Sequence, residues 1–186
     1  MKPTGIALLV LVMSAWLGAC NVPDAVPTSE QQPAAAQELD KFRDETSMLG
    51  RGNFRTHLSG GEEVPPVATR AQGQAIFHLN PDTTALSYKL IAANILNILQ
   101  AHIHVGAAGV NGPVVAFLYP SGPPPIPIPG RFDGVLATGT ITAANLVGPL
   151  AGQPLSALIS EMTAGNTYAN VHTTQNPGGE IRGQIR

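Results

Sequence analysis

Two histidines one residue apart, in the stretch AHIHV at residues 101–105, are the side chains of this sequence best placed for chemistry. Residues two apart on a strand point to the same side, so we expect His102 and His104 to share one face. A third histidine, His172, lies in the stretch TYANVHT. Three neutral imidazoles from neighbouring strands suit copper or zinc.

A structural role is the alternative for these histidines. Imidazole rings also donate hydrogen bonds to backbone carbonyls, and here Asn170 and Glu180 would be further partners. Such bonds would join neighbouring segments without any metal. The His-x-His spacing also occurs by chance, so the sequence leaves all three interpretations open.

The same alternation places other polar side chains on this face. In TYANVHT, Ala169 and Val171 fall on the apolar side, and Asn170 and His172 fall opposite them. In GEIRGQIR, the isoleucines point inward and the polar residues outward. If these strands are neighbours, the sequence predicts one polar cluster that contains His102, His104, His172, Glu180 and Arg182.

Short apolar runs separated by turn residues must position this cluster. The chain has 20 glycines and 17 prolines, and only 5% of its residues are aromatic. About eight strand candidates follow residue 53, and this pattern predicts an all-β, Greek-key-like antiparallel sandwich. In the first expected hairpin, Ala75, Phe77 and Leu79 alternate on one strand, and Leu86, Tyr88 and Leu90 alternate on the next. His57 and His78 are expected to face solvent.

Two segments depart from the strand pattern. In QPLSALISEMTAG, the apolar residues Leu155, Leu158, Ile159 and Met162 follow helical spacing, and Gly165 can end a short helix. The segment PSGPPPIPIPG at residues 120–130 has too few backbone N–H groups for a paired strand, so we expect an exposed, polyproline-like loop.

The amino terminus has the pattern of an export signal. An apolar run from Ile6 to Leu17 is followed by Leu-Gly-Ala-Cys, which resembles a bacterial lipobox ending at Cys20. The resemblance implies a signal peptide at residues 1–19, cleavage before Cys20 and a diacylglyceryl group on its sulfur. Residues 20–50 are rich in proline, alanine and charge and are expected to form a flexible tether. The domain then covers residues 51–186, outside the cytoplasmic membrane in the periplasm or extracellular space.

The composition argues against nucleic-acid binding, and the sequence has no recognisable catalytic motif. Charged residues make up 12% of the chain and the formal net charge is -2, so we expect no nucleic-acid binding. The sequence contains no nucleophile elbow, phosphate-binding loop or paired catalytic carboxylates. We therefore expect a protein that is not an enzyme.

Three ordered motifs resemble the CHRD domain, a module of secreted animal proteins and bacterial exported proteins. They are LSGGEEVPPVATRAQGQAIFHL, AHIHVGAAGVNGPVVAFL and YANVHTTQNPGGEIRGQI, within residues 53–186. The resemblance implies an extracellular all-β domain without an established activity. Its motif positions fall on the three histidines and on Glu63, Pro65, Gly112, Pro113, Asn170, Glu180 and Arg182. We expect Glu63, Asn170, Glu180 and Arg182 to orient the histidines or to stabilise the structure around them.

These observations support three functional hypotheses. The first is a non-enzymatic binding or structural module of the cell envelope, held at the membrane through lipidated Cys20 and with an envelope protein as its partner. The second is a copper- or zinc-binding envelope protein that uses His102, His104 and His172. The third is an enzyme resembling copper-zinc superoxide dismutase, which also has a His-x-His strand in a β-sandwich, although its remaining ligands have no clear counterparts here.

Overall fold

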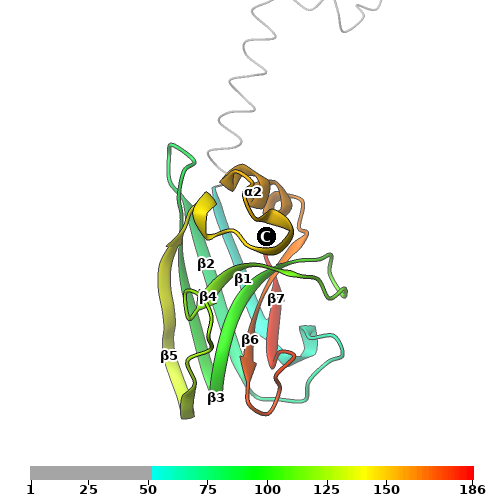
Figure 1. Cartoon of the computed structure of the whole chain (residues 1–186). Coiled ribbons are helices and arrows are strands. Elements are labelled where there is room, and N and C mark those ends of the chain that lie inside the picture. The colour runs from blue at the N-terminus through cyan, green and yellow to red at the C-terminus, as the bar shows by residue number, and fades with distance from the viewer. Residues whose placement is uncertain (1–51) are drawn as a thin grey trace, which may run out of the picture. The chain divides into compact units, whose positions relative to one another are not determined.

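The computed structural model describes residues 52–186, which form one antiparallel β domain (Figure 1). The expected signal peptide, the lipidation site Cys20 and the tether lie outside the described residues. The strands are β1 (Asn53–Ser59), β2 (Gln72–Leu79), β3 (Leu86–Val105), β4 (Val114–Tyr119), β5 (Ile128–Ile141), β6 (Thr167–Thr173) and β7 (Ile181–Gln184).

The seven strands close into a barrel-like sandwich. The order β2-β1-β7-β6-β3-β4 returns on itself because β2 also pairs with β3, and β5 pairs with β3 as well. Every pairing is antiparallel. The predicted all-β class is therefore confirmed.

The strand count is seven because two expected strands are one. β3 runs for 20 residues, pairing first with β2 and β5 and then with β6 and β4. Asn94 and Asn97 have positive φ angles of 54° and 53°, a conformation that asparagine tolerates better than most residues. The pairing register shifts at these points, so the strand bends there and continues. This bend directs the half of β3 that contains His102 and His104 toward β6.

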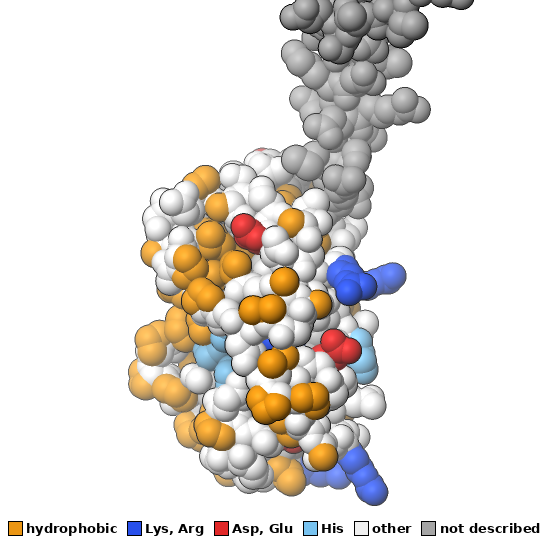
Figure 2. Space-filling view, turned by 90° about the vertical axis from the view of Figure 1, so that its right-hand side faces the viewer, with side chains coloured by type: hydrophobic (Ala, Val, Ile, Leu, Met, Phe, Trp, Pro, Cys, Tyr) orange, Lys and Arg blue, Asp and Glu red, His pale blue; other side chains and the backbone are white. Residues whose placement is uncertain are grey.

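The core fills the interior of the barrel and follows the predicted alternation. In the first hairpin, Ala75 lies opposite Leu90 and Phe77 lies opposite Tyr88. All four side chains are buried, so this expected hairpin is confirmed. Figure 2 shows that charged side chains are few on one face of the domain.

One helix covers an end of the barrel. Helix α2 (Leu155–Thr163) buries Leu155, Leu158 and Met162 in the common core, as the helical spacing predicted. Three short 3-10 turns, η2 (Gly60–Glu62), η3 (Ala143–Asn145) and η4 (Gly148–Leu150), join other elements. No helix within residues 52–186 is long and apolar enough to cross a membrane.

The proline-rich loop is shorter than the expected residues 120–130. Residues 120–127 connect β4 to β5, and their side chains are mostly exposed. The last part of the segment, from Ile128, already pairs with β3. Pro129 is tolerated there because β5 pairs only with β3 over this stretch, which leaves its other edge free.

Candidate functional site

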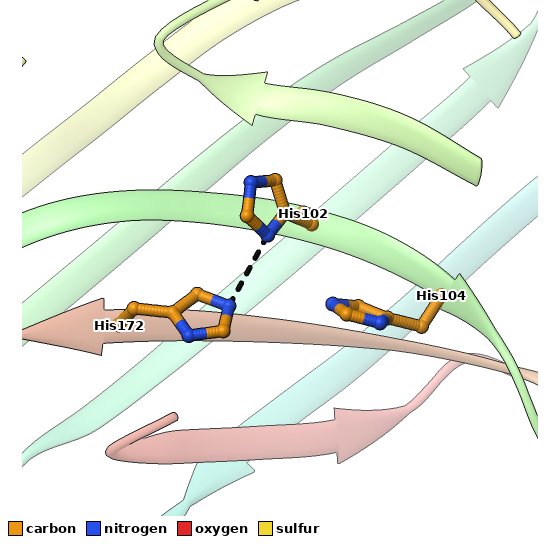
Figure 3. A group of neighbouring side chains, drawn as sticks. All are labelled: His102, His104 and His172. Carbon is orange, nitrogen blue, oxygen red and sulfur yellow. Dashed lines mark hydrogen bonds between the residues drawn. The ribbon is translucent and has the colours of Figure 1, made fainter. Parts of the chain in front are cut away.

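The three histidines meet where β3 pairs with β6. In the register of this pair, His102 lies opposite Asn170 and His104 lies opposite Tyr168, while His172 follows Asn170 by two residues. Alternation places all of these side chains on the face that points away from the barrel core. Figure 3 shows the three rings turned toward one another from the two strands.

The ring nitrogens are close enough to share a ligand. Nδ1 of His102 is 3.1 Å from Nε2 of His172. One nitrogen from each of the three rings lies within 4.8 Å of the others. In a tetrahedral zinc site the metal–nitrogen distance is about 2.0–2.1 Å, which places ligand nitrogens a little over 3 Å apart. The pair His102 and His172 is already close to this spacing, and in a bound site His104 would lie nearer to both.

Backbone carbonyls orient two of the rings. Nδ1 of His104 is 2.9 Å from the carbonyl oxygen of Gly112, and Nδ1 of His172 is 2.9 Å from that of Pro177. A carbonyl oxygen only accepts hydrogen bonds, so both Nδ1 atoms carry the proton. In the neutral rings the Nε2 atoms therefore present lone pairs. This is the arrangement in which a histidine binds a metal through Nε2.

The cluster is buried and incompletely hydrogen-bonded. The exposed fractions of His102, His104 and His172 are 4%, 8% and 6%. Nε2 of His102 and Nε2 of His104 are buried and find no hydrogen-bond partner among residues 52–186. Buried polar atoms usually have a partner, so these two nitrogens are available to bind a ligand.

Burial keeps all three rings neutral. Burial, together with the neighbouring rings of His172 and His104, lowers the pKa of His102 to about 3. Burial also lowers the pKa of His104 and that of His172, against opposing hydrogen bonds to Gly112 and Pro177 respectively. At neutral pH none of the rings carries a charge that would repel a metal ion. Nδ1 of His102 donates to Nε2 of His172, so its proton must move to Nε2 of His102 before Nδ1 can bind a metal ion.

Aromatic rings pack closely around the cluster. The Tyr168 ring stacks on His104 with a centroid distance of 4.7 Å and an interplanar angle of 9°. The Phe117 ring meets His102 edge-on at 4.9 Å. These contacts fix the planes of two imidazoles and keep most water away from them.

The loop at residues 106–113 packs against His104 and Tyr168 at one side of the cluster, which the sequence did not indicate. Arg182 holds this loop, donating to Oδ1 of Asn111 and to the carbonyl oxygen of Val110, each at 2.9 Å. Its guanidinium carbon lies 3.4 Å from the centre of the Tyr168 ring, a cation-π contact. Arg182 lies opposite Asn170 on the expected polar face, but loop 106–113 closes over it and leaves the residue 1% exposed.

Gly112 is required where this loop approaches β3. A side-chain carbon at this position would overlap the backbone carbonyl of Val105. Without one, the chain comes close enough for its carbonyl to accept the hydrogen bond of His104. A glycine at this position is therefore needed for the hydrogen bond that orients the His104 ring.

Glu180 does not have the imidazole partner that the sequence analysis offered for it. Its carboxylate accepts hydrogen bonds from the hydroxyls of Thr69 and Thr173, at 2.7 and 2.6 Å, and from the Asn176 amide at 3.2 Å. Glu180 precedes β7 rather than lying in it, so strand alternation does not fix its direction. It joins the loop before β2 to the β6–β7 turn, a structural role.

Glu63 lies beside this region as a buried acid. Its side chain is 5% exposed, and one carboxylate oxygen, Oε1, has no hydrogen-bond partner within the described domain. Burial raises the pKa of Glu63 to about 7, against the attraction of Arg182, which lowers it. The carboxyl group packs against Gly179, where any side chain would overlap it.

The remaining histidines lie on another surface. His57 and His78 are exposed, as expected, and line an open depression of about 1100 Å³ over β1 and β2. None of the three clustered histidines lines this depression. Among residues 52–186, the one group of three or more candidate metal ligands is His102, His104 and His172.

The fold and the site define a class of protein: a barrel-like antiparallel domain with a buried histidine cluster. The family model of the CHRD domain matches residues 54–185, which include every side chain of the cluster. The chain belongs to the CHRD domain family. Searches of curated proteins and of solved structures found no match.

The lowered histidine pKa values predict a loss of stability in acid. The unfolded chain takes up protons on these histidines near pH 6.5, whereas folded His102 does so only near pH 3. Protonation therefore favours the unfolded chain as the pH falls from about 6.5 toward 3, and the contribution is fully present above pH 6.5. Urea denaturation of metal-free protein between pH 8 and pH 4 should show this decline.

Replacing one ring isolates the effect. His102→Gln should show a smaller decline in unfolding free energy over this range than the unmodified protein. The carboxylates, including Glu63, remain in both proteins, so their contributions cancel in the comparison. Parallel pH profiles for the two proteins would refute the argument.

Proposed function

We propose that this chain is an exported, lipid-anchored CHRD protein of the cell envelope, and that its domain is a non-enzymatic module that binds one copper or zinc ion. His102 would bind through Nδ1, and His104 and His172 through Nε2. The lipobox-like sequence ending at Cys20 supports the anchor.

One observation carries the metal-binding proposal: three buried, neutral imidazoles converge with one nitrogen of each ring within 4.8 Å of the others. Two are held in the metal-binding tautomer by carbonyl oxygens. A cluster built only for hydrogen bonding would satisfy its buried nitrogens, whereas Nε2 of His104 has no partner within the described residues. A bound cation would satisfy it.

A structural clasp is the second candidate function. The bonds from His104 to Gly112 and from His172 to Pro177 join two loops to the sheet. These bonds form without an ion, so the cluster would stabilise a domain whose binding surface lies elsewhere. A partner protein of the envelope would then recognise that surface.

Metal loading separates the two candidates. The purified protein is incubated with Cu²⁺ or Zn²⁺, desalted and examined by elemental analysis. We expect about one ion per chain, as the single three-histidine group requires. The double variant His102→Ala/His104→Ala should lose it.

A second double variant is the matched control. His57→Ala/His78→Ala also removes two histidines, but from the exposed surface over β1 and β2. It should retain the ion. If the unmodified protein retains none, or if both double variants retain it equally, the metal-binding proposal fails and the clasp becomes the better account.

A further inference from the structure

Asn170 is a buried polar residue next to the histidine cluster. It lies on β6 opposite His102 and two residues before His172, on the same face as both. Its side chain is 2% exposed. Its carboxamide therefore lies beside the rings of His102 and His172.

The carboxamide oxygen of Asn170 accepts no hydrogen bond from the described residues. Oδ1 of Asn170 is buried and has no hydrogen-bond partner in the part of the chain that the structure describes. The side chain of Asn170 lies within hydrogen-bonding reach of the His104 ring. The neighbouring Nε2 of His104 presents a lone pair, since its Nδ1 carries the proton bound to Gly112.

Two buried acceptors side by side with no hydrogen between them are unfavourable unless a cation satisfies both. A carboxamide turned by 180° would offer the alternative solution, because Nδ2 would then donate to Nε2 of His104. The two solutions make different demands on residue 170. A cation needs an oxygen at this position, whereas the hydrogen bond needs an N–H.

We propose that Asn170 is a fourth protein ligand, which binds the metal ion through Oδ1 together with the three imidazoles. This inference rests on the proposed metal-binding function and extends it. The resulting set of three nitrogens and one oxygen completes a four-coordinate site. It suits Zn²⁺ or Cu²⁺, whereas Cu⁺ favours soft sulfur ligands.

Two substitutions test the oxygen. Asn170→Leu keeps the approximate size of the side chain and removes the ligand atom, and we expect it to weaken Zn²⁺ binding at least about tenfold. Asn170→Asp keeps the oxygen and adds negative charge, so it should bind Zn²⁺ more tightly than the unmodified protein. Affinities are measured on the purified chain by competition with a chelator of known affinity.

Thr167→Val provides the matched control on the same strand. Thr167 is fully buried, and its hydroxyl also has no partner within residues 52–186, but alternation places it on the opposite face of β6. It should leave Zn²⁺ affinity unchanged. A general response of β6 to the loss of a buried polar group would instead weaken binding in both variants.

A spectroscopic measurement adds a signature that a structural role would not change. The electron paramagnetic resonance spectrum of bound Cu²⁺ depends on its donor atoms, and Asn170→Asp should shift the g value and the copper hyperfine splitting. If Asn170→Leu does not fold, Asn170→Asp still decides through its spectrum and affinity.

The two proposals fail in different ways. If the unmodified protein binds no ion, the proposed function fails and this inference fails with it. If the ion is bound and His102→Ala/His104→Ala loses it, while Asn170→Asp changes neither affinity nor spectrum, only the role of Asn170 is overturned. Equal weakening by Asn170→Leu and Thr167→Val would also overturn it.

Discussion

Arg182→Met is expected to destabilise the domain by about 2–4 kcal/mol. Hydrogen bonds from a charged donor contribute about 1.5–3 kcal/mol each, and Arg182 donates two at 2.9 Å to the loop at residues 106–113. The variant also loses the cation-π contact with Tyr168. Methionine restores part of the packing but none of the donors, so the loop should also exchange its amide hydrogens faster.

Arg131→Met is the matched control for this prediction. Arg131 pairs with Asp133 on the surface, with side chains 63% and 47% exposed. Such exposed pairs contribute little, so we expect a much smaller loss of stability than in Arg182→Met. Urea denaturation measures both variants, and hydrogen exchange follows residues 106–113. Equal losses in the two variants would show that Arg182 does not hold the loop in place.

Cys20→Ala is expected to abolish lipid attachment completely. Only a cysteine provides the sulfur to which a diacylglyceryl group is added, and Cys20 is the only cysteine of the chain. Acyl chains contribute about 0.8 kcal/mol per buried CH₂ group, and two or more together anchor a protein stably. In a bacterial host, the unmodified protein should therefore begin at Cys20 and carry the mass of its acyl groups.

Mass spectrometry of the amino-terminal peptide checks this prediction better than cell fractionation. An uncleaved signal sequence can also keep the variant with the membrane, so location alone is ambiguous. The variant should yield no acylated peptide. An unmodified Cys20 in the unaltered protein, or a chain that keeps residues 1–19, would contradict the proposed anchor.

Local patterns in the sequence were enough to predict much of the fold. The hairpin of β2 and β3 and the helix α2 follow from alternation and from helical spacing, which depend only on nearby residues. The continuity of β3 was not predictable in this way. Asn94 and Asn97 resemble turn residues in sequence, and only their pairing with β5 shows that the strand continues through them.

The sequence was enough to predict which histidines form the candidate site. It did not predict their burial or their hydrogen-bond partners. Alternation placed His102, His104 and His172 on one face, because parity along paired strands is a local property. Burial of that face was not predictable, since it depends on a loop folding back over the sheet. The partners of His104 and His172 are backbone carbonyls, which any residue has, so no side-chain pattern indicates them.

Anomalous diffraction from crystals of the zinc-loaded protein, recorded on both sides of the zinc absorption edge, tests metal binding most directly. Our account predicts one strong anomalous peak, about 2.0–2.1 Å from Nδ1 of His102 and from Nε2 of His104 and His172. A loaded crystal with no peak at this position, or with zinc only beside the exposed His57 and His78, would contradict it.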